Sequence, residues 1–184
     1  MNYLANATNF LSQAIIGFAL YVVLLRFWMQ WVRADFRNQI GQFIITVTNP
    51  VVLPLRKILP SIGAVDSATV VLAFCIALLK VFILFSLHKA NLEPLRLAVV
   101  ALSQVILFSI HLFMAAVIIQ VIASWINPHG YNPIVAVAHA IAEPILAPAR
   151  RLIPSIGGLD LSPILVFLFL QLTIQLVVYP LQNF

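Results

Sequence analysis

Residues 49–66 read N-P-V-V-L-P-L-R-K-I-L-P-S-I-G-A-V-D, and residues 143–160 read E-P-I-L-A-P-A-R-R-L-I-P-S-I-G-G-L-D, 94 positions later. Self-similarity at a fixed spacing indicates a duplicated unit. The sequence therefore predicts two structural repeats, residues 1–90 and residues 91–184. Without a gap, the two motifs share eight identical pairs: Pro50/Pro144, Pro54/Pro148, Arg56/Arg150, Pro60/Pro154, Ser61/Ser155, Ile62/Ile156, Gly63/Gly157 and Asp66/Asp160.

The composition places both repeats in a membrane. Hydrophobic residues make up 63% of the chain and charged residues 8%, and the mean hydropathy is +1.09, whereas about a quarter of the residues in a soluble domain are charged. A helix needs about 20 apolar residues to cross the hydrocarbon core. The expected fold is an all-α membrane protein in which each repeat is helix, motif, helix, with four spans at residues 10–32, 68–87, 97–126 and 161–178.

Basic residues are concentrated in the two connections that hold the motifs. By the positive-inside rule, both motif loops are cytoplasmic and both termini are outside. Each repeat crosses twice, so both repeats start on the same side, which predicts a parallel pseudo-two-fold axis along the membrane normal. This bias accounts for the net charge of +5, and no basic stripe with interleaved aromatics indicates nucleic-acid binding. The motif connections hold Arg33, Arg37, Arg56, Lys57, Arg150 and Arg151, against Lys89 and Arg96 between the repeats.

Prolines and glycines organise each motif. We expect the first proline of each copy to begin a new short helix, because a missing N–H costs nothing at the first helical position. The segment before it has one apolar face, which suits an amphipathic helix at the membrane interface. A later proline ends the short helix, and a glycine permits the positive φ of the turn into the next span. The structural residues of the motif are thus Pro50, Pro54, Pro60, Gly63, Pro144, Pro148, Pro154 and Gly157.

Asp66 and Asp160 are the acids that both copies share. Each follows its basic pair after a glycine turn. The carboxylate can fold back to the guanidinium of Arg56 or Arg150, or it can cap the N-terminus of the next span. The sequence leaves both uses open.

Five polar residues inside the spans are further candidates, because an ionisable or polar group is costly in lipid. Lys80 lies deep in its span, so we expect it to face protein or water. Arg26 either reaches the cytoplasmic surface or belongs to a stripe with Gln30 and Arg33. His111 is interpreted as a neutral imidazole bonded to a neighbouring helix, and two amides are interpreted as groups that join helices: Gln171 and Gln175.

The pattern P-x-x-x-P-x-R-[KR]-x-x-P-x-x-G-[AG]-x-D-x-[SA], present twice between hydrophobic helices, resembles the YggT family of small bacterial membrane proteins, with YlmG and chloroplast relatives. The resemblance implies a multi-pass protein of the bacterial cytoplasmic (inner) membrane. It also implies links to osmotic or salt tolerance, cell shape or division, nucleoid distribution and, in chloroplasts, cytochrome assembly. It implies no enzymatic activity. The first copy departs from the fuller family pattern, with Ala64 where the second has Gly158 and Ala68-Thr69 where the second has Ser162-Pro163.

These observations predict a non-enzymatic protein without a cofactor that organises membrane-protein partners or anionic lipids. Its contacts are the basic pairs, Arg56-Lys57 and Arg150-Arg151, since anionic headgroups attract cations near the surface. One alternative is a channel or ion-handling protein in osmotic stress, which requires a homo-oligomer because four spans are few for a pore. Another is a haem assembly factor with His111 as the axial ligand. The four histidines lack the spacing of a metal site.

Overall fold

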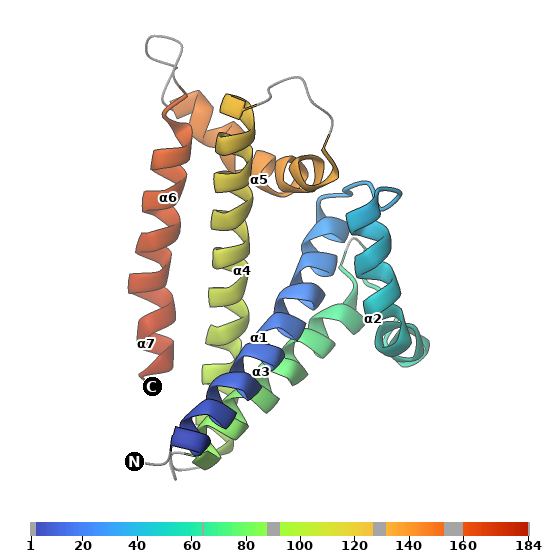
Figure 1. The fold of residues 1–184 in the computed structure, drawn as a ribbon, viewed down its shortest axis with the longest axis vertical. Coiled ribbons are helices and arrows are strands. Elements are labelled where there is room, and N and C mark those ends of the chain that lie inside the picture. The colour runs from blue at the N-terminus through green and yellow to red at the C-terminus, as the bar shows by residue number, and fades with distance from the viewer. Residues whose placement is uncertain (1–2, 64, 88–92, 127–131, 153–159, 184) are drawn as a thin grey trace.

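The computed structural model describes residues 3–63, 65–87, 93–126, 132–152 and 160–183. This part of the chain is almost entirely helical, as Figure 1 shows. The helices are α1 (Tyr3–Trp31), α2 (Gln39–Ile58), α3 (Ser67–Leu87), α4 (Pro94–Ile126), α5 (Pro133–Leu152), α6 (Ser162–Thr173), the π-helix η1 (Ile174–Val178) and α7 (Tyr179–Gln182).

Four helical segments are long and apolar enough to cross a membrane. Their bounds lie within a few residues of the sequence-based ones, except that the last is longer: Asn9–Trp31, Ser67–Leu87, Pro94–Ile126 and Ser162–Gln182. This last span is α6, η1 and α7 in continuous succession. Pro180 explains the π-helical segment, because its ring clashes with the carbonyl four residues earlier and widens the preceding turn. The predicted four-span all-α fold is confirmed.

Both motif helices begin at the same end of the molecule, which we call the motif end. Figure 1 shows that α1 and α4 end near the top of the view, where α2 and α5 begin, that α2 then runs down the side of the molecule, and that both chain termini lie toward the bottom. The two repeats therefore run in the same direction, as two repeats of two spans each require. That the motif end faces the cytoplasm remains a prediction.

The motif prolines lie inside helices and do not begin them. Pro50 and Pro54 are interior residues of α2, and Pro144 and Pro148 are interior residues of α5. The prediction that a new helix starts at the first proline of each copy is therefore wrong. A proline removes one hydrogen bond and crowds the preceding turn, which bends a helix that is otherwise well supported. Figure 1 shows that both helices change direction along their length.

The ends of α2 follow the sequence more closely. The helix begins after Asn38, whose side-chain oxygen accepts the Gly41 N–H at 2.7 Å, as an N-cap does. It ends at Ile58, before Pro60. Gly63 has a φ of +61°, the left-handed conformation expected for the turn toward α3. Pro154 and Gly157 of the second copy lie outside the described residues.

Small residues let the spans approach each other closely. Ala73 and Ala77 of α3 and Ala101 and Ala116 of α4 are buried in the core, as is typical of helix contacts in membranes, where packing and not water exclusion holds helices together. The two repeats are also joined by a polar contact. Trp28 of α1 donates its indole N–H to the Ser109 hydroxyl of α4 at 3.1 Å.

Candidate functional site

In the first copy, the end of α2 is tied to the start of α3 by an ion pair. Arg56 Nη2 lies 2.6 Å from Asp66 Oδ2, and Arg56 Nε donates to both carboxylate oxygens at 3.2 and 3.3 Å. The Thr69 hydroxyl donates to the same carboxylate. The Asp66 side chain is 4% exposed and that of Arg56 is 36% exposed. The sequence left two partners open for the Asp66 carboxylate, a guanidinium or the N-terminus of α3. In the structure the carboxylate binds the guanidinium of Arg56.

The surroundings of Asp66 favour its ionised form. Burial alone raises the pKa of a carboxyl group. Hydrogen bonds from Arg56 and Thr69 and the positive charges of Arg56 and Arg26 outweigh that effect, so the pKa of Asp66 lies below its ordinary value. Gln30 of α1 completes this cluster. With its amide oriented to match its neighbours, Gln30 donates to Asp66 Oδ2 at 3.0 Å and accepts from Arg56 Nη2 at 2.6 Å.

Arg26 connects α1 to the middle of α2. It is 3% exposed, and its Nη1 donates to the Thr48 hydroxyl and, at 2.9 Å, to Asn49 Oδ1. A guanidinium that is buried and hydrogen-bonded does not reach the surface, so of the two alternatives for Arg26 the structure favours the internal one. Its partner Asn49 is the first residue of the motif.

In the second copy, one arginine holds two carboxylates. Arg150 Nη1 donates to both oxygens of Glu143 at 2.8 and 2.9 Å, and Arg150 Nε donates to Asp160 Oδ2 at 3.0 Å. Asp160 Oδ1 also accepts the Ser162 N–H at 2.9 Å, which caps α6. Asp160 therefore serves both of the uses that the sequence left open.

The charges of this cluster reinforce one another. Burial opposes ionisation of Asp160, but the hydrogen bonds from Ser162 and Arg150 and the charge of Arg150 lower its pKa below the ordinary value. Burial likewise disfavours the Arg150 cation, yet its two carboxylate partners raise the pKa of the guanidinium. Asp160 and Arg150 are therefore both charged at neutral pH.

Each copy has one additional charged residue near its motif, and the two additional charges have opposite signs. Arg26 in the first repeat corresponds to Gln120 in the second, and Asn49 corresponds to Glu143. The first copy thus has a second arginine near its motif, whereas the second copy has a second acid. The carbonyl oxygen of Gln120 is buried without a partner among the described residues. The two motifs share a fold but differ in charge.

In each motif, one cation forms no ion pair with the described residues. Lys57 and Arg151, which follow Arg56 and Arg150 in the chain, are exposed. Within the described ranges, neither makes an ion pair. The basic pairs therefore divide their roles, because one member fixes the motif and the other points to the surroundings.

Comparison with known proteins agrees with this repeated architecture. The CCB3/YggT family model matches residues 5–87 and 99–181, one segment in each repeat. The chain belongs to the CCB3/YggT family.

Relatives in this family cover nearly the whole chain. YggT of Escherichia coli K12 is 36% identical over 166 residues, which is 90% of this chain and 86% of the relative. An uncharacterized protein of Pseudomonas aeruginosa, PA0392, is 41% identical over 180 residues, 95% and 90% of the two chains. An uncharacterized protein encoded in the proC 3' region of Vibrio alginolyticus is 40% identical over 168 residues, 90% of each chain. No solved structure matches the chain.

The polar groups inside the spans of this YggT-family protein have separate environments. Lys80 of α3 donates from Nζ to Gln104 Oε1 of α4 at 3.1 Å and lies 5.1 Å from the centre of the Phe108 ring. Lys80 therefore faces protein, as expected. His111 Nδ1 of α4 lies 3.4 Å from the Tyr21 hydroxyl of α1, so it contacts a neighbouring helix.

Gln171 and Gln175 have no such partner. Both are exposed on the last span, and among the described residues neither side chain forms a hydrogen bond. Within the described part of this chain they therefore join no helices, and a role in joining helices of separate chains stays a prediction. They lie where lipid or another protein surrounds the span.

Sequence reasoning did not find all the partners in this YggT-family protein. Thr48, Asn49 and Glu143 contact the arginines, and none of them was predicted as an arginine partner. A signal was present in the fixed repeat spacing, because Arg26 aligns with Gln120 while Asn49 aligns with Glu143. A cation present in one copy and an acid present in the other mark polar positions that lie close together in the fold.

Proposed function

We propose that this protein is a non-enzymatic organiser of the bacterial cytoplasmic membrane that gathers anionic lipids or membrane-protein partners at its motif face. The observation that carries the proposal is the exposed cation of each motif, Lys57 or Arg151, held beside an arginine that an acid already neutralises. A cation without an internal acid is available to a phosphate headgroup, which attracts it by about 1 kcal/mol near the membrane surface.

The arrangement of the motifs supports this role. Both motif helices begin at one end of the molecule (Figure 1), and each contains interior prolines. The ion pairs Arg56–Asp66 and Arg150–Asp160 tie the end of each motif helix to the start of the next span. In this proposal, the ion pairs hold Lys57 and Arg151 where both can meet headgroups of the cytoplasmic leaflet. The relation of the YggT family to osmotic or salt tolerance, cell shape and division fits an organising role in the envelope.

Lipid enrichment around the purified protein tests the proposal. The protein is reconstituted in mixed phosphatidylglycerol and phosphatidylcholine, and energy transfer from its tryptophans to a headgroup-labelled phosphatidylglycerol is measured. Replacement of Lys57 and Arg151 by Gln should weaken the enrichment by roughly tenfold or more, because each cation contributes about 1 kcal/mol. The matched control is Arg96→Gln, near the start of α4, away from the motifs. Equal enrichment in the double variant and the wild type would refute the lipid role.

A second candidate function rests on Lys80. Its ammonium group has an amide and a ring as neighbours, and an ionisable group inside a span is a candidate for ion handling. If oligomers of the protein conduct ions, flux in proteoliposomes should be lost with Lys80→Leu and retained with Lys80→Arg. Flux that is absent from the wild type, or equal in both variants, would exclude this function.

A further inference from the structure

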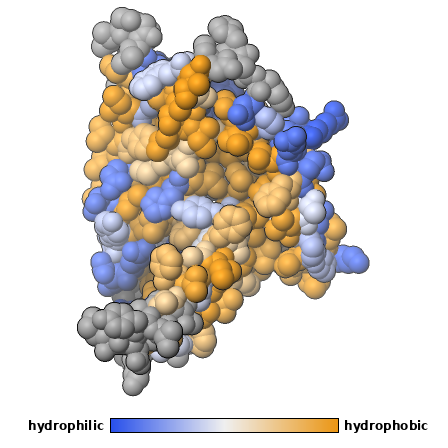
Figure 2. Space-filling model, in the orientation of Figure 1, coloured by the Kyte–Doolittle hydropathy of each residue, from blue (hydrophilic) through white to orange (hydrophobic). Residues whose placement is uncertain are grey.

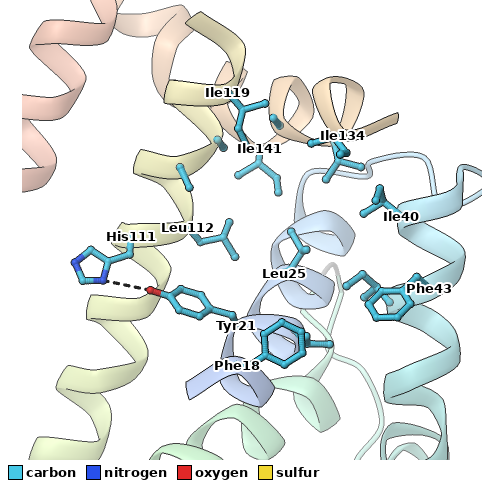
Figure 3. A pocket seen from close by; sticks show the side chains of 16 residues that line it. Phe18, Tyr21, Leu25, Ile40, Phe43, His111, Leu112, Ile119, Ile134 and Ile141 are labelled. Atoms are coloured by element: carbon cyan, nitrogen blue, oxygen red, sulfur yellow. Dashed lines mark hydrogen bonds between the residues drawn. The ribbon is translucent and has the colours of Figure 1, made fainter. Parts of the chain in front are cut away.

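An apolar hollow lies between the two repeats. It has a volume of about 420 Å³ and is lined by α1, α2, α4 and α5. Figure 3 shows the lining side chains converging from both repeats, and Figure 2 shows apolar residues around a hollow in the middle of this face. Pockets that bind small ligands have volumes of about 300–1,000 Å³. The hollow is therefore large enough for a ligand.

The lining follows the repeat. Seven pairs of lining residues are 94 positions apart in the chain, among them Leu25/Ile119, Ile40/Ile134 and Ile44/Ala138. Equivalent residues of two repeats surround one space only where the axis that relates the repeats passes through it. The hollow is thus a product of the pseudo-symmetric fold and not an accident of one loose contact.

The chemistry of the hollow favours an aliphatic chain. Its side chains are apolar except for Tyr21 and His111, which contact each other across the repeats (Figure 3). Water needs two to four polar partners and would find few here. A second helix, about 10–12 Å thick, is too bulky for a space of this volume. Most of the lining belongs to membrane spans, where the surrounding solvent is lipid tails.

An exposed cation lies in the connection that leads to the hollow. Arg37, between α1 and α2, is exposed and forms no ion pair with the rest of the described chain. Arg37 precedes the lining residue Ile40 by three positions. Figure 2 shows hydrophilic side chains beside the hollow, where this connection lies in Figure 1.

Arg33, the other cation of this connection, lines a separate polar hollow with Gln30, Arg56 and Asp66. We therefore do not assign it to the apolar hollow.

We propose that the hollow binds one acyl chain of an anionic phospholipid whose phosphate is held by Arg37. The apolar lining selects the chain, and the guanidinium group selects the negative headgroup. This inference shares with the proposed function the use of anionic lipid as a ligand, but it places one lipid at a defined site, away from Lys57 and Arg151.

Photolabelling of the reconstituted protein tests the site. The probe is phosphatidylglycerol with a diazirine near the end of one acyl chain, and mass spectrometry locates the adducts. We expect adducts on the lining residues of α1 and α4. Ala115→Trp should reduce them at least tenfold, because Ala115 is an exposed residue of the lining that a larger ring would extend into the hollow. The matched control, Ala14→Trp, is exposed on α1 outside the hollow and should leave the adducts unchanged.

A second comparison tests the headgroup. Arg37→Gln should reduce labelling by the phosphatidylglycerol probe by roughly fivefold, while labelling by the same probe built on phosphatidylcholine stays constant. Equal labelling by both probes in the wild type would overturn the proposal. So would adducts spread evenly over the lipid-facing helices and insensitive to Ala115→Trp, or displacement of the probe by an uncharged isoprenoid.

The two proposals fail separately. Lipid enrichment that does not change when Lys57 and Arg151 are replaced, with labelling of the hollow intact, refutes only the organising role. The reverse result refutes only the hollow as a lipid site.

Discussion

At the residue scale, the two aspartates that the repeats share, Asp66 and Asp160, have unequal importance. Arg56 has one carboxylate partner, Asp66, whereas Arg150 keeps Glu143 when Asp160 is changed. Asp66→Asn should therefore lower the free energy of unfolding by about 1–3 kcal/mol, the cost of leaving a part-buried charge without its partner. Asp160→Asn should cost only about 0.2–1 kcal/mol, because that pair is exposed and asparagine can still cap α6.

Thermal unfolding of both variants in the same detergent measures this difference. Asp35→Asn, an exposed acid outside both clusters, is the control for the loss of a charge. A larger effect of Asp160→Asn than of Asp66→Asn would contradict the geometry of the two clusters.

The lowered pKa of Asp66 leads to a second prediction, on the pH dependence of stability. Because this pKa is lower in the folded protein than the ordinary value of about 3.9, the unfolded chain binds the proton more tightly. The stabilisation from Asp66 is thus fully present above about pH 4 and is lost as the pH falls through the folded pKa. Unfolding midpoints between about pH 6 and pH 3 should fall more steeply for the wild type than for Asp66→Asn. Parallel curves would show that the ion pair contributes nothing.

At the element scale, the beginning of α2 depends on a glycine. A Cβ atom at Gly41 would lie 2.5 Å from the backbone of Phe36, whereas one at Gly17 would be 3.5 Å from the Phe108 ring, an ordinary contact. Gly41→Ala should therefore cost about 1–3 kcal/mol through overpacking. Gly17→Ala should be neutral or stabilise α1 by up to about 1 kcal/mol. Unfolding in detergent compares the two, and equal effects would show that α2 begins elsewhere.

The helices of this protein were predictable where hydrophobicity decides them. The membrane spans could be predicted directly from the long apolar stretches, because the backbone in lipid has no alternative to internal hydrogen bonds. The motif helices were harder. Pro50 satisfies the rule for a helix start, but Arg26 binds Thr48 and Asn49 just before it, so support from α1 allows α2 to continue through its prolines. Such tertiary support is not visible in local sequence.

The site was predictable only in part for the same reason. Identity between the copies pointed to Arg56 and Asp66, whose separation in sequence suits a turn. Gln30 and Arg26 reach the motif from another helix, and their contacts depend on how α1 packs. The hollow was not predictable at all, because it exists only after the two repeats are placed side by side.

At the scale of the whole molecule, the shared direction of the repeats predicts a topology. In a Cys75→Ala background, a single cysteine at position 2 or position 183 should react with an impermeant reagent from outside the cell. A cysteine at Ser61, which is exposed in the first motif, should react only from the cytoplasm, as the bias of basic residues requires. Labelling of either terminus only from the cytoplasm would reverse the orientation.

The apolar hollow between the repeats, lined by α1, α2, α4 and α5, also indicates how this chain could have arisen. Its walls are built from matching positions of the two halves, the arrangement that a self-complementary contact between two identical chains produces. A gene for one half, doubled and fused, would inherit that contact together with the space along its axis. Fusion then frees the two walls to diverge. Tyr21 aligns with Ala115 and His111 aligns with Gly17, so the hydrogen bond between Tyr21 and His111 across the hollow has no counterpart in the other half. At these positions the two walls already differ.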